Sequence, residues 1–193
     1  MNAIRHAWKV LVLVALASPI ALAKVPAKPA TAKLNFDGVE YVHRASMSGR
    51  SDFTPASQPG LDSWRDRVTI IVRENVTSGD QLSGIAGNLF ATVSDLGEVV
   101  RTDSVANPQT QSTEHFFAAS LQGKGFTQAA FARLALVEGK GMVVVYSHRS
   151  YGEHSAETST EWMDRNGEAI EGKLMSWTGM PKLAQLRALP QSK

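Results

Sequence analysis

The sequence predicts an α+β fold, in which an antiparallel sheet with a four-strand meander packs against one central amphipathic helix and one C-terminal helix. Three observations predict it. Residues 78–97 follow a helical hydrophobic period, four strand-like runs succeed one another over residues 98–151, and helical spacing returns over residues 155–177. The 193-residue chain contains no cysteine. We therefore expect one domain whose core forms without disulfides.

The first 23 residues have the pattern of a cleavable export signal. Basic residues in MNAIRHAWK precede the apolar stretch VLVLVALASPIALA, which ends in a small-x-small cleavage site at residues 21–23. This stretch is shorter than the roughly 20 apolar residues of a membrane-spanning helix. We expect cleavage after residue 23, then a flexible leader rich in Pro, Ala and Lys over residues 24–33. The product should be soluble in the periplasm, with no later membrane span.

Strands and a long loop are expected before the central helix. The runs VEYVHRASM (39–47) and VTIIVREN (68–75) are rich in β-branched and apolar residues and predict two strands. Between them, SGRSDFTPASQPG (48–60) contains many turn-forming residues and predicts a loop. One helical turn is expected in LDSWRDR, directly before the second strand.

The central helix has the clearest local signals. Ser78 and Gln81 match a capping box, and Gly97 supplies the stop. Gly84 and Gly87 each cost the helix about 1 kcal/mol relative to alanine, which predicts close packing at both positions. The apolar positions on one stripe are Leu82, Ile85, Ala86, Leu89, Phe90, Val93 and Leu96.

Four strand-like runs and a second helix complete the expected domain, residues 34–178. Glycines in two GKG segments mark turns of the meander. The last helix carries a second capping-box pattern at Thr158 and Glu161. Residues 179–193 are expected to form a tail with a loose docking turn. The four runs are EVVRTDSV (98–105), HFFAASL (115–121), FTQAAFARLALVEG (126–139) and MVVVYSHRSY (142–151).

In this order of elements, residues 39–177 resemble the PsbP-like fold. The resemblance depends on VTIIVREN, the helix around GDQLSGIAGNLFATV, the meander and the closing helix that ends in KLMSW. It implies a mostly non-catalytic, partner-binding class of domains, several of which are exported. That fold has no catalytic motif to match residue by residue, so the resemblance transfers no functional residue.

The segment YSHRSYGEH (146–154) concentrates titratable side chains at the end of a strand. Strand alternation places Tyr146 and His148 on one face and Ser147, Arg149 and Tyr151 on the other. Neighbouring residues in a strand point apart, so this segment cannot form a serine–histidine pair by itself. A hydrolase would need a base from elsewhere in the chain. The candidate bases are His43, His115 and His154.

No metal site or cofactor is predicted. Four histidines lie in the region after the leader, but the spacing of His148 and His154 matches no usual zinc pattern. The formal net charge is +2, and Arg5 and Lys9 belong to the expected signal. The remaining chain therefore lacks the basic field of a nucleic-acid-binding protein.

Arg133 and Arg149 each interrupt an otherwise apolar strand in neighbouring hairpin arms. A buried arginine must be paired. The pattern therefore indicates a structural salt-bridge network with Glu114 or Glu153, or a patch that recognises anions. We expect both arginines on the open face of the sheet, which is not covered by a helix.

The predicted function is that of an exported, non-catalytic binding protein that recognises a periplasmic protein partner or a small anionic ligand. The open sheet face and the 48–64 loop are the expected surface, although Phe53 and Trp64 in that loop also fit a structural flap held in the core. One alternative is an inhibitor or immunity-type protein that plugs an enzyme. Another is a histidine- or metal-dependent hydrolase. The candidate binding residues are Arg44, Phe53, Arg133, Tyr146, His148, Arg149, Tyr151 and His154.

Overall fold

One eight-stranded antiparallel sheet forms the centre of the computed structural model, which describes residues 32–192. The expected signal (1–23) and nearly all of the expected leader (24–33) lie outside the described residues. The strands and helices are β1 (Lys33–Phe36), β2 (Val39–Met47), β3 (Arg50–Pro55), β4 (Asp66–Arg73), α1 (Gly79–Leu96), β5 (Gly97–Asn107), β6 (Ser112–Gly123), β7 (Phe126–Val137), β8 (Lys140–Tyr151), α2 (Ser155–Met175) and α3 (Leu183–Arg187).

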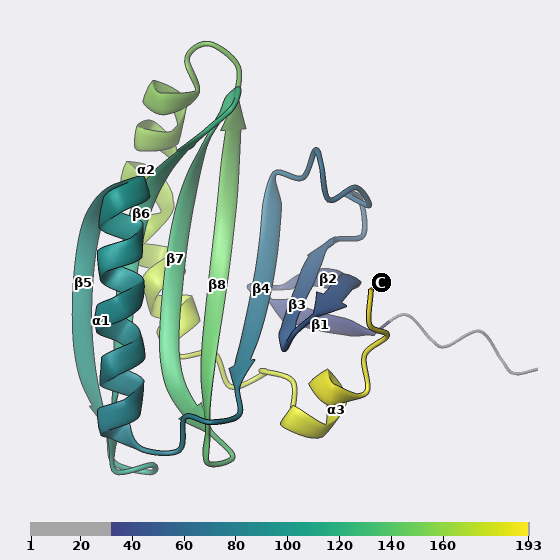
Figure 1. The fold of residues 1–193 in the computed structure, drawn as a ribbon. Helices are drawn as coiled ribbons and strands as arrows, with labels where there is room; N and C mark the ends of the chain where they lie inside the picture. Colours follow the sequence, from purple (N-terminus) through teal and green to yellow (C-terminus); the bar gives the residue numbers. More distant parts are fainter. Residues whose placement is uncertain (1–31, 193) are drawn as a thin grey trace, which may run out of the picture. The chain divides into compact units, whose positions relative to one another are not determined.

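The sheet consists of two halves that meet between β4 and β8. Its strand order is β1-β2-β3-β4-β8-β7-β6-β5, so neighbours within each half follow one another along the chain. After β4, the chain passes through α1 to the far edge of the sheet and returns strand by strand to β8 (Figure 1). The central pairing runs from Asp66 opposite His148 to Arg73 opposite Gly141.

The two long helices lie on opposite faces of the sheet, as Figure 1 shows. Helix α1 packs against β5, β6 and β7, and α2 packs against β6, β7 and β8. Because successive side chains of a strand point to opposite faces of the sheet, the same strands contribute to both helix interfaces. Phe117 and Leu134 belong to the core on the α1 side, whereas Phe116 and Phe131 belong to the core on the α2 side. Both faces of this half of the sheet are therefore apolar.

The α+β class and the antiparallel sheet agree with the prediction, but a four-strand meander packed on one central helix is wrong. The sheet has eight strands, and a helix covers each face. Strand β3 lies within the expected 48–60 loop, and β1 begins at the last residue of the expected leader. Both are short strands beside tight turns, where Gly38 and Gly49 and the residues before them have positive φ. Such turns close two-residue hairpins.

Helix α1 begins as its sequence predicts, because Ser78 Oγ accepts a hydrogen bond from the Gln81 N–H at 3.3 Å. The predicted close packing at Gly84 and Gly87 is wrong. A Cβ atom built at either position meets no described atom within 4 Å. The expected helical turn in LDSWRDR is also wrong, because residues 61–65 are in neither a helix nor a strand and the last two residues begin β4. Trp64 in that segment is nevertheless fully buried.

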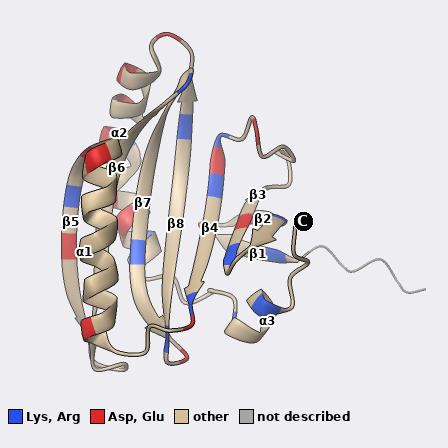
Figure 2. Ribbon diagram, viewed as in Figure 1, with Lys and Arg blue, Asp and Glu red and all other residues tan. Residues whose placement is uncertain are grey.

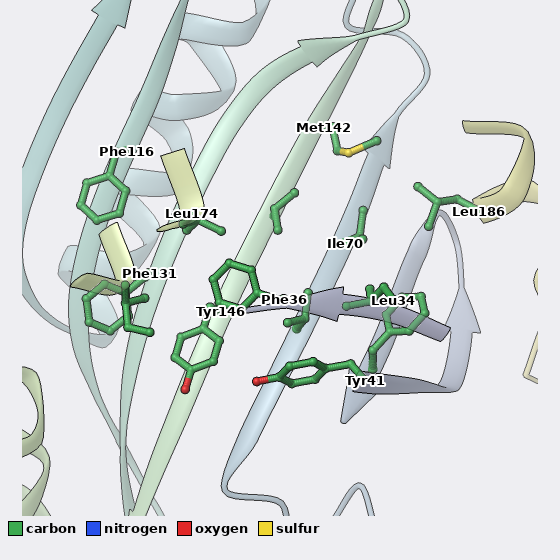
Figure 3. Close-up of a cluster of buried hydrophobic side chains, with 14 of the residues drawn as sticks. Leu34, Phe36, Tyr41, Ile70, Phe116, Phe131, Met142, Tyr146, Leu174 and Leu186 are labelled. Atoms are coloured by element: carbon green, nitrogen blue, oxygen red, sulfur yellow. The ribbon is translucent and has the colours of Figure 1, made fainter. Parts of the chain in front are cut away.

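The core on the α2 side joins both halves of the sheet, as Figure 3 shows. Phe36 and Ile70 come from the first half, Tyr146 from β8, and Leu174 from α2. The segment after α2 also contributes to this core, since Leu183, Leu186 and Leu189 are buried there. Within residues 32–192, no helix has both the length and the hydrophobicity needed to cross a membrane.

Candidate functional site

The candidate site lies on the α1 side of the sheet, over β2, β3, β4 and the end of β8. Helix α1 packs on β5, β6 and β7, and α2 and α3 contribute to the core on the opposite face. Figure 2 shows Lys and Arg residues on β3, β4 and β8 in this part of the sheet. We call this surface the open face. Residues whose side chains lie on it include Arg44, Met47, Arg50, Asp52, Arg67, Thr69 and Arg149.

Two arginines and two aromatic rings stack on the open face. The guanidinium carbon of Arg67 lies 4.1 Å from the centre of the Trp64 ring, and that of Arg149 lies 4.0 Å from it. Arg149 also lies 3.8 Å from the centre of the Phe126 ring. The Tyr151 hydroxyl donates to the Trp64 carbonyl at 2.7 Å. These five residues form the Trp64 cluster, in which each cation–π contact is worth about 0.5–2 kcal/mol.

Positive charge dominates the surroundings of this cluster. Asp52 is the carboxylate beside it, and both of its oxygens accept from Arg50, at 2.9 and 3.0 Å. Its nearer oxygen is 3.6 Å from Arg67 Nε, which is not a hydrogen bond. Burial lowers the pKa of Arg67 to about 10, the Asp52 charge opposes this shift, and the charges of Arg50 and Arg149 add to it. The described carboxylates therefore leave Arg67 incompletely compensated.

Two buried donors in the cluster also lack partners. Trp64 Nε1 and Arg67 Nε are both buried and make no hydrogen bond to any described residue. Buried polar groups in proteins are nearly always satisfied, so two neighbouring exceptions call for an acceptor. Guanidinium groups bind carboxylates and phosphates with strong, directional hydrogen bonds. The arrangement can therefore hold an anionic group.

Arg44 and Tyr151 lie at the margins of the open face. Arg44 Nε donates to Thr54 Oγ1 at 2.8 Å, and its terminal nitrogen donates to the Pro55 carbonyl at 3.0 Å. Its side chain is therefore held in place, partly exposed. Tyr151 is 42 % exposed and can contact a partner directly.

Tyr146 and His148 lie on the opposite face, as strand alternation predicts. Asp66 Oδ1 accepts from the Tyr146 hydroxyl at 2.9 Å and from His148 Nδ1 at 2.8 Å, while Asp66 Oδ2 accepts from Gln58 at 3.0 Å. Burial raises the pKa of Asp66, but these hydrogen bonds outweigh it and hold the pKa below its usual value. The His148 ring stacks on Trp162, with 4.1 Å between ring centres.

A cavity of ≈ 320 Å³ adjoins this network. Tyr41, Gln58, Asp66 and Tyr146 are among the residues that line it. Burial raises the pKa of both tyrosines, and the Asp66 charge raises them further. Both phenols therefore stay protonated, and that of Tyr146 donates to Asp66. His148 does not line the cavity, and the bonds of Asp66 to Tyr146 and His148 link the start of β4 to β8.

Arg133 is part of the core, and the expectation that it shares the open face with Arg149 is wrong. Its register partner is Val144, whose side chain points to the α2 side. Arg133 Nε donates to Glu114 at 2.7 Å, and a terminal nitrogen donates to the carbonyls of Leu174 and Trp177. Arg133 therefore forms the structural salt bridge that the sequence left open as one alternative.

Phe53 and His154 also lie away from the open face. Phe53 is 2 % exposed and packs in the core on the α2 side. His154 precedes α2 and lies 3.2 Å from Glu157, with both side chains exposed. The structure therefore brings Arg149 and Tyr151 together, and it places Arg133, Tyr146, His148, Phe53 and His154 elsewhere.

Sequence reasoning missed Arg67 and Phe126 as members of the site. The signal for Arg67 was present, since alternation along β4 puts Arg67, Thr69 and Ile71 on one face. Phe126 opens β7 directly opposite Tyr151, and only the strand register shows that proximity.

No protein-family model matches the chain, and a search of curated proteins finds no significant match. Among the described residues, no group of three His, Asp or Glu side chains is placed to hold a metal ion.

Proposed function

We propose that this protein is exported and binds an anionic surface of a periplasmic protein partner through its open face. The Trp64 cluster carries the proposal, because Arg67 and Arg149 both lie against Trp64 while Asp52 also pairs with Arg50. A carboxylate of the partner would balance the excess positive charge that Asp52 leaves on Arg67 and Arg149. This face binds its partner and has no catalytic role.

Several features support a protein partner over a small ligand. The open face is the surface of a sheet, and Met47 is 62 % exposed on it next to Arg50. Tyr151 is exposed at its other end. Aromatic residues, methionine and arginine are the types enriched in protein interfaces. The signal-like residues 1–23 and the resemblance to PsbP-like domains support export and partner binding.

A photo-cross-linking experiment in cells tests the proposal. In one variant, a photoreactive residue replaces Met47 on the open face. In the matched control, it replaces Phe90 on α1, which is 44 % exposed. We expect one protein to be captured from position 47 and not from position 90. Arg149→Met should remove that band, because it removes a cation and keeps most of the side-chain length. Arg165→Met, an exposed residue of α2, should leave it unchanged.

Two results would contradict the proposal. One is capture from position 47 that Arg149→Met does not weaken, since binding would then be independent of the cluster. The other is equal capture from both positions, which would indicate chance collisions. Binding of the purified partner should also weaken as salt is raised, because the interaction is between opposite charges.

A further inference from the structure

A second group of reactive side chains lies away from the open face, between α1 and the edge strand β5. Ser104 of β5 is directly opposite His115 of β6. Ser104 Oγ lies 3.0 Å from His115 Nδ1, and Ser83 Oγ of α1 lies 3.0 Å from His115 Nε2. Figure 1 shows that α1 runs along β5 and β6, the two strands that contribute Ser104 and His115.

The direction of each hydrogen bond follows from the number of protons available. Ser83 Oγ donates its single proton to the Gly79 carbonyl at 3.0 Å, so it must accept from Nε2–H of His115. Nδ1 of the neutral ring is then unprotonated and accepts from the Ser104 hydroxyl. Burial lowers the pKa of His115, which favours this neutral form. A hydroxyl that donates to a fixed, neutral imidazole is the arrangement that activates a serine nucleophile.

A cavity of ≈ 300 Å³ adjoins Ser104 and His115. Its walls include Phe90 of α1 and Phe117 of β6, which make part of the lining apolar, and Thr102 and Asp103 also line it. Gly87 also lines it, and a Cβ atom added there would meet no described atom within 4 Å. The cavity therefore has room for a short apolar chain beside the serine hydroxyl.

We propose that Ser104 is a nucleophile that accepts a short apolar acyl group from an ester, with His115 as its general base and Ser83 as a positioning residue. Ser104 Oγ attacks the ester carbonyl while its proton passes to His115 Nδ1. The ester C–O bond then breaks, and His115 returns that proton to the departing alkoxide, which leaves as an alcohol. Water attacks the acyl-Ser104 ester by the same route, releasing a carboxylic acid and the free serine.

The surroundings of Ser104 also limit which esters react. The Ser104 N–H donates to Asp103 Oδ1 at 2.7 Å. In acyl transfer, such a backbone N–H stabilises the oxyanion that forms on the carbonyl oxygen. Because Asp103 occupies this donor, we expect efficient reaction with activated esters and fluorophosphonates and slow reaction with unactivated esters.

The test treats the full chain with a fluorophosphonate probe and, separately, with 4-nitrophenyl butyrate, and locates the adduct by peptide mass spectrometry. We expect a single adduct on Ser104, and none after Ser104→Ala. His115→Gln should slow the reaction by about 100-fold, since general-base catalysis contributes at least that factor. Ser94→Ala, an exposed serine of α1, should react at the original rate. An adduct on another residue, no adduct, or an unchanged rate in His115→Gln would overturn the proposal.

Two further variants distinguish chemistry from loss of structure. Ser83→Ala should slow acylation about tenfold, and Ser83→Thr should restore it, because threonine keeps the hydroxyl that orients His115. Gly87→Leu places a larger side chain in the cavity. It should reduce reaction with 4-nitrophenyl butyrate much more than reaction with 4-nitrophenyl acetate. Equal rates for the two esters in Gly87→Leu would show that the cavity does not hold the acyl chain.

Discussion

Replacing Arg133 with methionine tests how far the core depends on one buried ion pair. Arg133 is 8 % exposed and Glu114 is 5 % exposed, and their charged atoms lie 2.7 Å apart. Removing one partner of such a pair costs about 3–5 kcal/mol, because the other charge stays buried without compensation. The carbonyls of Leu174 and Trp177 also lose their donor. We therefore expect the free energy of unfolding to fall by about 4 kcal/mol.

Urea unfolding followed by circular dichroism measures this loss. In a thermal unfolding experiment on a domain of this size, the same loss should lower the melting temperature by about 8–16 °C. The matched control is Arg101→Met, because Arg101 is exposed where it pairs with the partly buried Glu171 at 2.8 Å, and pairs open to solvent contribute about 1 kcal/mol or less. The double variant Arg133→Met/Glu114→Gln should recover part of the loss, since no charge then stays buried. A loss from Arg133→Met no larger than that from Arg101→Met would refute the reasoning.

Two more predictions concern stability. Gly84→Ala and Gly87→Ala should each raise the free energy of unfolding by about 0.5–1 kcal/mol, because both added methyl groups find open space and alanine favours the helix. Urea unfolding measures this change. A lower free energy of unfolding in either variant would show that α1 packs more tightly at that position. Burial lowers the pKa of His43 and of His115, so the unfolded chain binds protons more readily, and the free energy of unfolding should fall as the pH drops from 7.5 to 5. His43→Gln should flatten this pH dependence, and an unchanged slope would contradict the assignment.

Local signals in the sequence predicted some of the individual elements correctly. The run 39–47 is a strand with those bounds, and Ser78 caps α1. Alternation along β8 correctly separated His148 from Arg149. Each of these conclusions depends on residues within one element, where periodicity and capping chemistry act directly.

Features that depend on strand register could not be predicted in this way. The face on which Arg133 lies follows from its pairing with Val144, which neither strand reveals alone. The Trp64 cluster combines Trp64, which precedes β4, with residues of β4, β7 and β8. Strand β3 was missed because its six residues lie among turn formers that close hairpins at each end. The sequence therefore indicated two of the five residues of the Trp64 cluster, Arg149 and Tyr151, and Arg44 at the margin of the open face.

The pairing of β4 with β8 also determines the order in which the chain can fold. Within residues 32–192, the hydrogen-bonded pairing that joins the two halves of the sheet is that of β4 with β8, and β8 is the last of these strands along the chain. Contacts between residues far apart in sequence form slowly, so this closure is expected to limit the folding rate. Until residues 140–151 are available, β4 and β7 each present an open edge, and such edges can pair with other chains and aggregate. During synthesis, aggregation through these two edges is therefore most probable before β8 has paired with β4 and β7.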